Sequence, residues 1–97
     1  MSLFLESVKD KVGEECNATW WSSLLAQAEL KGWKPDEPAE YTTYVTNDGA
    51  ILKEKDVKSL VEIVRANKEE FKKVSGIDEI EDEFLDFLEN AGGIKVE

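Results

Sequence analysis

The stretch EKDVKSLVEIVRANKEEFKKV, residues 54–74, has the most regular pattern in the chain. Its apolar side chains recur every three or four residues, and Lys, Arg and Glu occupy most positions between them. Because one helical turn takes about 3.6 residues, this spacing brings the apolar side chains to one face. The pattern predicts an amphipathic helix over 54–74. The side chains that face the core are Val57, Leu60, Val61, Val64, Phe71 and Val74.

A second helix is predicted upstream, over 18–31. Asn17 and Thr19 are both competent N-caps, and Gly32 ends the periodic run because glycine readily adopts the left-handed backbone that closes a helix. The apolar face of this helix consists of Trp20, Trp21, Leu24, Leu25 and Ala28.

A third helix is predicted downstream, over 78–91. Ser75 with Asp78, or Asp78 with Glu81, offers a capping box at its start, and Ala91-Gly92-Gly93 ends it. Its apolar face would carry Ile77, Ile80, Phe84, Phe87 and Leu88.

Two segments have the composition of β-strands. β-Branched and aromatic residues fill positions 41–46, and Asn47-Asp48-Gly49 supplies residues that tolerate positive φ before another apolar run, so a hairpin is predicted over about 41–53. Ile94-Lys95-Val96 alternates as a short strand does, and we expect it to join the hairpin.

The first sixteen residues fit two patterns. Leu3, Leu5 and Ser7 alternate like a strand, whereas Phe4, Val8 and Val12 fit a helix. We favour the strand, because Gly13 and the charges around it resemble a turn. The resulting order predicts one α+β domain over 1–97, in which a small antiparallel or mixed sheet packs against about three helices.

The composition limits the possible chemistry. The chain has 97 residues with 22 Asp and Glu against 12 Lys and Arg, a net charge of -10, and no histidine. Without imidazole, the commonest metal ligand and the usual general base are missing, so we expect no catalytic residues, no cofactor and no metal. Phosphate groups would be repelled, so direct binding of nucleic acid is not expected.

Cysteine and hydropathy bear on location. The chain has one cysteine, Cys16, and no apolar run approaching the roughly 20 residues of a membrane span. We therefore expect a cytoplasmic protein that does not bind membranes. Glu14 and Glu15 lie beside Cys16, and their charge would raise the pKa of its thiol and leave it inert.

Residues 78–89 carry most of the excess acidity, with seven carboxylates in twelve residues and no Lys or Arg among them. They fit either a docking surface for a basic partner protein or a solvated helix face, because the helix dipole favours the four acids near the predicted N-terminus. The candidate contact residues are Glu79, Asp82, Glu83 and Asp86, joined by Trp20.

Aromatic side chains offer an alternative site. Trp20, Trp21, Trp33, Tyr41 and Tyr44 fit either core packing or the lining of a small-ligand groove. Adjacent Trp20 and Trp21 point about 100° apart on a helix, so only one of them can lie at the centre of a core. The outer one is expected to contact a partner or to cover the loop at residues 35–38.

The pattern Trp21-x-x-Leu24-Leu25-x-x-Ala28, then Gly32-Trp33-x-Pro35, then Tyr44-x-x-Asn47-Asp48-Gly49 resembles a group of small bacterial proteins of unassigned function. The likeness covers about residues 17–96 and implies a single cytosolic domain, with no established reaction. The sequence departs from that group at Lys53, where a capping Thr or Ser is usual.

These observations favour a non-enzymatic protein that acts through protein–protein interaction with a basic partner. Its sharpest version is an immunity-type or phosphate-mimicking inhibitor of a toxin or defence nuclease. The alternatives are a small-ligand-binding domain that uses the Trp and Tyr cluster, and a homodimer in which the first strand or Ile94–Val96 pairs with a second copy.

Overall fold

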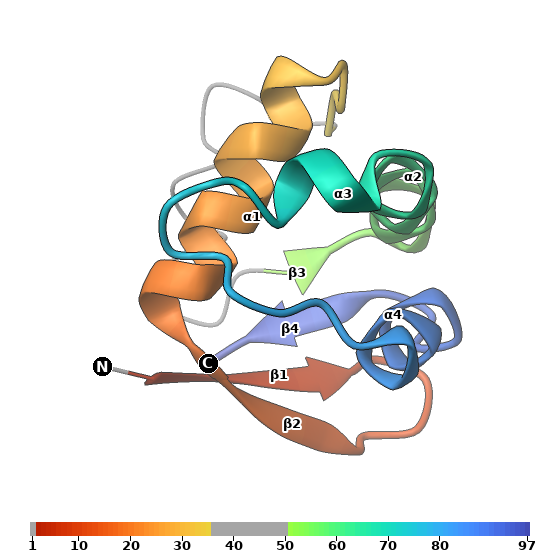
Figure 1. Cartoon of the computed structure of the whole chain (residues 1–97). Helices are drawn as coiled ribbons and strands as arrows, with labels where there is room; N and C mark the ends of the chain where they lie inside the picture. Colours follow the sequence, from red (N-terminus) through yellow and green to blue (C-terminus); the bar gives the residue numbers. More distant parts are fainter. Residues whose placement is uncertain (1, 36–50) are drawn as a thin grey trace.

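The computed structural model describes residues 2–35 and 51–97 (Figure 1). The predicted α+β class is confirmed, because a four-stranded sheet packs against helices. In chain order, the elements are β1 (Ser2–Ser7), β2 (Gly13–Asn17), α1 (Ala18–Leu30), β3 (Ile51–Leu52), α2 (Glu54–Ala66), α3 (Lys68–Phe71), α4 (Asp82–Glu89) and β4 (Ile94–Val96). Most of the hairpin predicted over 41–53, including its turn, lies outside the described residues.

The N-terminal strand is confirmed, and it is one half of a hairpin that the sequence reading did not foresee. β1 pairs antiparallel with β2, with Leu5 opposite Glu14. The connecting turn closes when the Ser7 N–H donates to the Val12 carbonyl at 2.7 Å and the Lys11 N–H donates to the Ser7 carbonyl at 2.9 Å. The alternative helix through Phe4, Val8 and Val12 is wrong, because its members lie in a strand and a turn.

The sheet has the order β2-β1-β4-β3, and all its pairings are antiparallel. β4 lies between β1 and β3, so the C-terminal strand joins the sheet beside Leu52, as expected. Because β1 and β4 are both inner strands, neither has a free edge for the pairing across a dimer that the sequence suggested. Among the described strands, the two at the edges of the sheet are β2 and β3.

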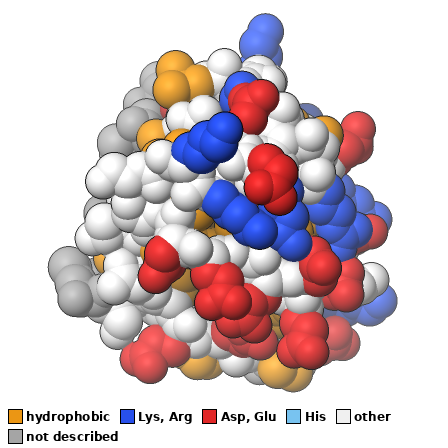
Figure 2. Space-filling view, viewed as in Figure 1, with side chains coloured by type: hydrophobic (Ala, Val, Ile, Leu, Met, Phe, Trp, Pro, Cys, Tyr) orange, Lys and Arg blue, Asp and Glu red, His pale blue; other side chains and the backbone are white. Residues whose placement is uncertain are grey.

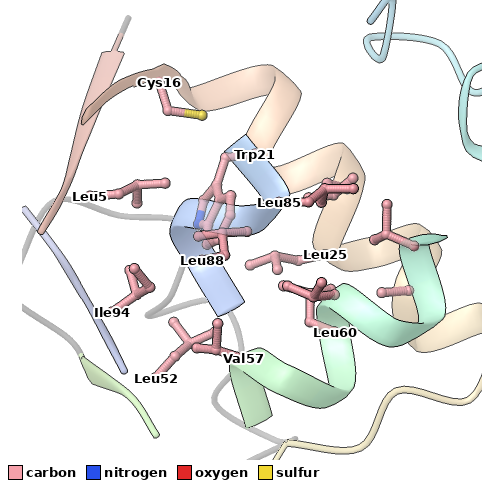
Figure 3. Packing of buried hydrophobic residues seen from close by; sticks show 14 of the residues in the cluster. Leu5, Cys16, Trp21, Leu25, Leu52, Val57, Leu60, Leu85, Leu88 and Ile94 are labelled. Atoms are coloured by element: carbon pink, nitrogen blue, oxygen red, sulfur yellow. The ribbon is translucent and has the colours of Figure 1, made fainter. Parts of the chain in front are cut away.

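One face of the sheet is buried against the helices. Along β1, Leu3, Leu5 and Ser7 are buried, whereas Phe4 between them is 43% exposed. Leu5, Leu52 and Ile94 point from the strands toward the core side chains of the helices (Figure 3). Alternation with a period of two therefore places the core between the sheet and the helices.

The helix predicted over 54–74 is interrupted at Asn67. Its apolar stripe from Val57 to Phe71 is buried as predicted and Val74 is half-buried, but α2 ends at Ala66 and the short α3 spans only Lys68–Phe71. The Asn67 side-chain amide donates to the Ile63 carbonyl at 2.9 Å, and its backbone has φ -126°. Asn side chains compete with helical backbone hydrogen bonds, which explains the break.

The helix predicted over 78–91 begins later, at Asp82. Ile77 and Ile80 are both buried from a non-helical segment, and Glu81 at the N-cap is extended with φ -88° and ψ 136°. Burial of these two isoleucines holds the backbone out of the helix, so neither predicted capping box forms. Consequently two acids, Asp82 and Glu83, lie in the first helical turn instead of four.

Both ends of α1 follow the sequence. The Trp33 N–H donates to the Ala28 carbonyl at 2.9 Å, and the Gly32 N–H donates to the Glu29 carbonyl at 3.1 Å. This pair of bonds is the Schellman motif, in which Gly32 has φ +104°. At the other end, Asn17 Oδ1 accepts from the N–H groups of Thr19 at 2.9 Å and Trp20 at 3.1 Å.

Substitution of Asn17 by alanine is expected to lower the free energy of unfolding by about 1 kcal/mol, because the two amides lose their acceptor. Thr19→Ala is the control, since its side chain caps no amide and the change should stay within about 0.5 kcal/mol. Urea unfolding followed by circular dichroism measures both. A larger loss for Thr19→Ala would identify Thr19 as the cap.

Within residues 2–35 and 51–97, no helix is both long and apolar enough to cross a membrane.

Candidate functional site

The acids at 78–89 divide into two sets according to their partners. Asp82 accepts from Lys68 Nζ at 2.8 Å. Arg65 of α2 binds both Asp86 and Glu89, the latter at 2.7 Å. In Figure 2, Lys and Arg side chains form a band over α2 and α3, and acidic side chains gather below it over α4 and β2. Part of the charge asymmetry is therefore used to join α4 to the basic helices.

Lys68 changes the titration of its partner. The hydrogen bond from Lys68, and then its charge, hold the pKa of the Asp82 carboxyl below its ordinary value. A lowered pKa favours the folded state above the ordinary Asp value near 3.9, and this contribution is lost as the pH falls through the folded-state pKa. Because Asp82 is exposed, the contribution is small.

The second set of acids has no cationic partner among the described residues. Asp78, Glu79, Glu81 and Glu83 make no ion pair with any residue that the structure describes. They line a hollow of about 300 Å³, which faces the edge strand β2. Its lining residues are Glu14, Glu15, Cys16, Asn17, Trp20, Asp78, Glu79, Glu81, Glu83 and Phe84.

A neighbouring hollow of about 360 Å³ continues toward the β1–β2 turn. Val12, Phe87 and Ala91 give it an apolar surface, and Asp86 lies on its rim. Glu83 lines both hollows, so they meet at this side chain. We call the two together the acidic groove; it lies between residues 10–17 and residues 78–91.

Aromatic rings line the acidic groove between its carboxylates. Trp20 and Phe84 pack edge to face with their centroids 5.3 Å apart, and Phe87 follows at 6.2 Å from Phe84. Trp20 Nε1 donates to the Glu79 carbonyl at 2.9 Å. The outer tryptophan is therefore Trp20, and this bond joins it to the segment before α4. Residues 36–38 of the loop that it was expected to cover lie outside the described residues.

The five residues singled out by the sequence do not all lie in the acidic groove. Trp20, Glu79, Glu83 and Asp86 line it, and Asp82 faces Lys68 outside it. The sequence reading did not place Glu14 and Glu15 in this site. In the sequence, these two residues stand out only as adjacent acids beside Cys16. That feature indicates a site only when β2 is known to be an edge strand.

The other tryptophans lie away from this site. Trp21 is fully buried, and Trp33 is 2% exposed with its Nε1 donating to the Asp56 carbonyl at 2.8 Å. Tyr41 and Tyr44 lie outside the described residues. The small-ligand alternative requires the three tryptophans to surround one cavity, and in the part of the chain that the structure describes they do not.

Cys16 is buried at the inner side of β2. Burial, and then the charge of Glu14, raise the pKa of its thiol to about 12 from an ordinary 9.0. The sequence attributed the effect to the neighbouring acids, and burial is the larger cause.

Alkylation of Cys16 by iodoacetamide at mildly alkaline pH is expected to be about a thousandfold slower in the native protein than in urea. A pKa raised from 9.0 to about 12 lowers the reactive thiolate fraction by that factor. Mass spectrometry of timed samples measures both rates. Equal rates would show that the thiol is accessible and ionises normally in the folded state.

The acidic groove can hold cationic groups by charge while its rings contact their apolar parts. Across 2–35 and 51–97, no three Asp, Glu, Cys or His side chains are grouped so that they could hold a metal ion. No protein-family model, curated protein or solved structure matches this chain.

Proposed function

We propose that this chain is a non-enzymatic cytoplasmic protein that binds a partner protein through the acidic groove. The partner presents a basic surface. The observation that carries the proposal is the division of the acids, in which Lys68 and Arg65 neutralise one set and the set facing β2 has no cation among the described residues.

Charge repulsion supports a role for the second set. Glu79, Glu81 and Glu83 lie within five residues and share one hollow of about 300 Å³ with Glu14. Like charges at this spacing repel each other and lower stability, whereas a basic partner converts the same charges into attraction and faster association. A solvated face needs no such concentration beside an edge strand.

The basic surface belongs, in the sharpest form of the proposal, to a toxin or defence nuclease. Enzymes that act on nucleic acid bind phosphates through Lys and Arg, and spaced carboxylates can occupy the same positions. The chain would then act as an immunity-type or phosphate-mimicking inhibitor.

The proposal is tested by affinity capture from an extract of the organism that makes the protein. Three baits are compared at low and high salt. They are the unchanged chain, a groove variant with Glu79→Gln, Glu81→Gln and Glu83→Gln, and a control variant with Glu62→Gln, Glu69→Gln and Glu97→Gln. The control carries the same change in net charge at acids outside the acidic groove.

We expect a partner that the unchanged chain and the control variant retain at low salt, and that the groove variant loses. High salt should release it, because screening weakens exposed charge pairs. If the partner is a nuclease, the unchanged chain should also inhibit its activity. Equal capture by all three baits, or capture indifferent to salt, would contradict the proposal.

A further inference from the structure

In the described part of the sheet, β2 is an edge strand, and its outer backbone groups have no partner there. Phe4 exchanges hydrogen bonds with Glu97, at 3.0 Å and 2.8 Å, so its N–H and C=O point toward β4. In an antiparallel ladder these directions alternate along each strand. The flanking residues Leu3 and Leu5 therefore bond to their partners on β2, and the groups of Gly13 and Glu15 point away from β1.

The N–H and C=O groups of Gly13 and Glu15 make no hydrogen bond with the residues that the structure describes. β2 lies at the edge of the sheet in Figure 1. A free edge of this kind is a template for one more strand.

The acidic groove lies beside this edge. Glu14 shares the inner side of β2 with buried Cys16, because side chains alternate along a strand, and Val12 lies just before the strand opposite buried Ser7. Both line the groove, one in each hollow. A strand added to β2 would place every second side chain on this inner side, against Phe84, Phe87 and the carboxylates.

We propose that the partner segment is an extended basic peptide that pairs with the free edge of β2 and directs alternate Lys or Arg side chains into the acidic groove. This inference rests on the proposed function and specifies how the partner binds. The aliphatic stems would pack on the rings, and the charged heads would reach Glu14, Glu81 and Glu83.

Charge argues against a second copy of the chain as the added strand. Pairing β2 with itself brings Glu14 and Glu15 of the two copies together, and facing like charges destabilise a strand pair. A basic segment meets the same two acids with attraction.

The test uses the full chain and a synthetic peptide of about nine residues, in which Lys and Arg alternate with Val and Thr. The control is a methylated form of the same peptide. It is made in two versions, each with N-methyl groups on one of the two alternating sets of backbone amides, which keeps the charge but prevents strand pairing. Titration calorimetry measures affinity, and amide hydrogen exchange follows Gly13 and Glu15.

We expect the first peptide to protect both amides and to bind about tenfold more tightly than the methylated one, as the loss of two hydrogen bonds implies. Glu15→Pro should weaken its binding further than Glu15→Gln does. Proline removes an outward N–H and sterically blocks the edge, while both variants lose the same charge.

Equal binding of the two peptides, with both amides exchanging as in the free protein, would overturn strand addition and leave the proposed function standing. Failure of both peptides to bind at low salt would count against both proposals.

Discussion

Replacing Trp21 with alanine is expected to lower the free energy of unfolding by about 3–5 kcal/mol, which is the usual loss for a buried Trp or Phe. Trp21 is fully buried in α1, and its ring points into the core cluster between the strands and the helices (Figure 3). Its removal leaves a cavity that α1 could close only by moving toward the sheet and disturbing its other core contacts. Because a domain of this size has about 5–15 kcal/mol of stability, much of it would be lost.

Trp20→Ala is the matched control one residue earlier. Trp20 is half-buried, with one hydrogen bond to Glu79 and edge-to-face contact with Phe84, so we expect a smaller loss of about 1–2 kcal/mol. Urea unfolding monitored by circular dichroism compares the two without relying on tryptophan fluorescence. If Trp21→Ala unfolds the chain in water, Trp21→Phe keeps the comparison measurable, and a loss smaller than that of Trp20→Ala would show that Trp21 is not central.

The sequence predicts an element correctly where the residues of that element alone determine its structure. The predicted stripe is buried from Val57 to Phe71, the Schellman motif at Gly32 ends α1, and Ile94–Val96 forms a strand. In each case the periodicity or the glycine acts within a few residues. These features could be predicted because no distant contact competes with them.

Distant contacts explain the failures. Residues 78–81 have good capping signals, yet Ile77 and Ile80 are both buried from a non-helical segment, and that burial outweighs the propensity to form helix there. β2 has only Glu14, Glu15 and Cys16 between Gly13 and Asn17, a poor strand composition, and it becomes a strand because β1 pairs with it.

The acids of the candidate site could be predicted from the sequence. Which of them pair with Lys or Arg, and which do not, could not be predicted. Sequence alone indicates that the acids at 78–89 are concentrated, and it gives no sign that Arg65 and Lys68 reach Asp86 and Asp82. Those pairs exist because α2 packs beside α4 and the chain continues directly from α2 into α3. The acids that keep no cation are a product of the same packing, so they appear only in the folded chain.

Replacing Gly93 with alanine is expected to lower the free energy of unfolding by about 2–4 kcal/mol, from backbone strain and a steric clash together. Gly93 is buried before β4 with φ +114°, a conformation that side chains rarely adopt. An added Cβ would lie 3.0 Å from the Leu52 carbonyl oxygen and 3.3 Å from Val8 Cγ2. The substitution would therefore press on β3 and on the turn after β1 at once.

Gly32→Ala separates the two causes. Gly32 has a similar φ of +104°, and an added Cβ there meets no atom within 4 Å, so its loss of about 1–2 kcal/mol reports backbone strain alone. Thermal and urea unfolding of both variants give the difference, which we assign to the contacts with Leu52 and Val8. Equal losses would mean that β3 and the turn shift to accommodate the added Cβ at no cost in stability. The packing around Gly93 would then be less rigid than its buried contacts indicate.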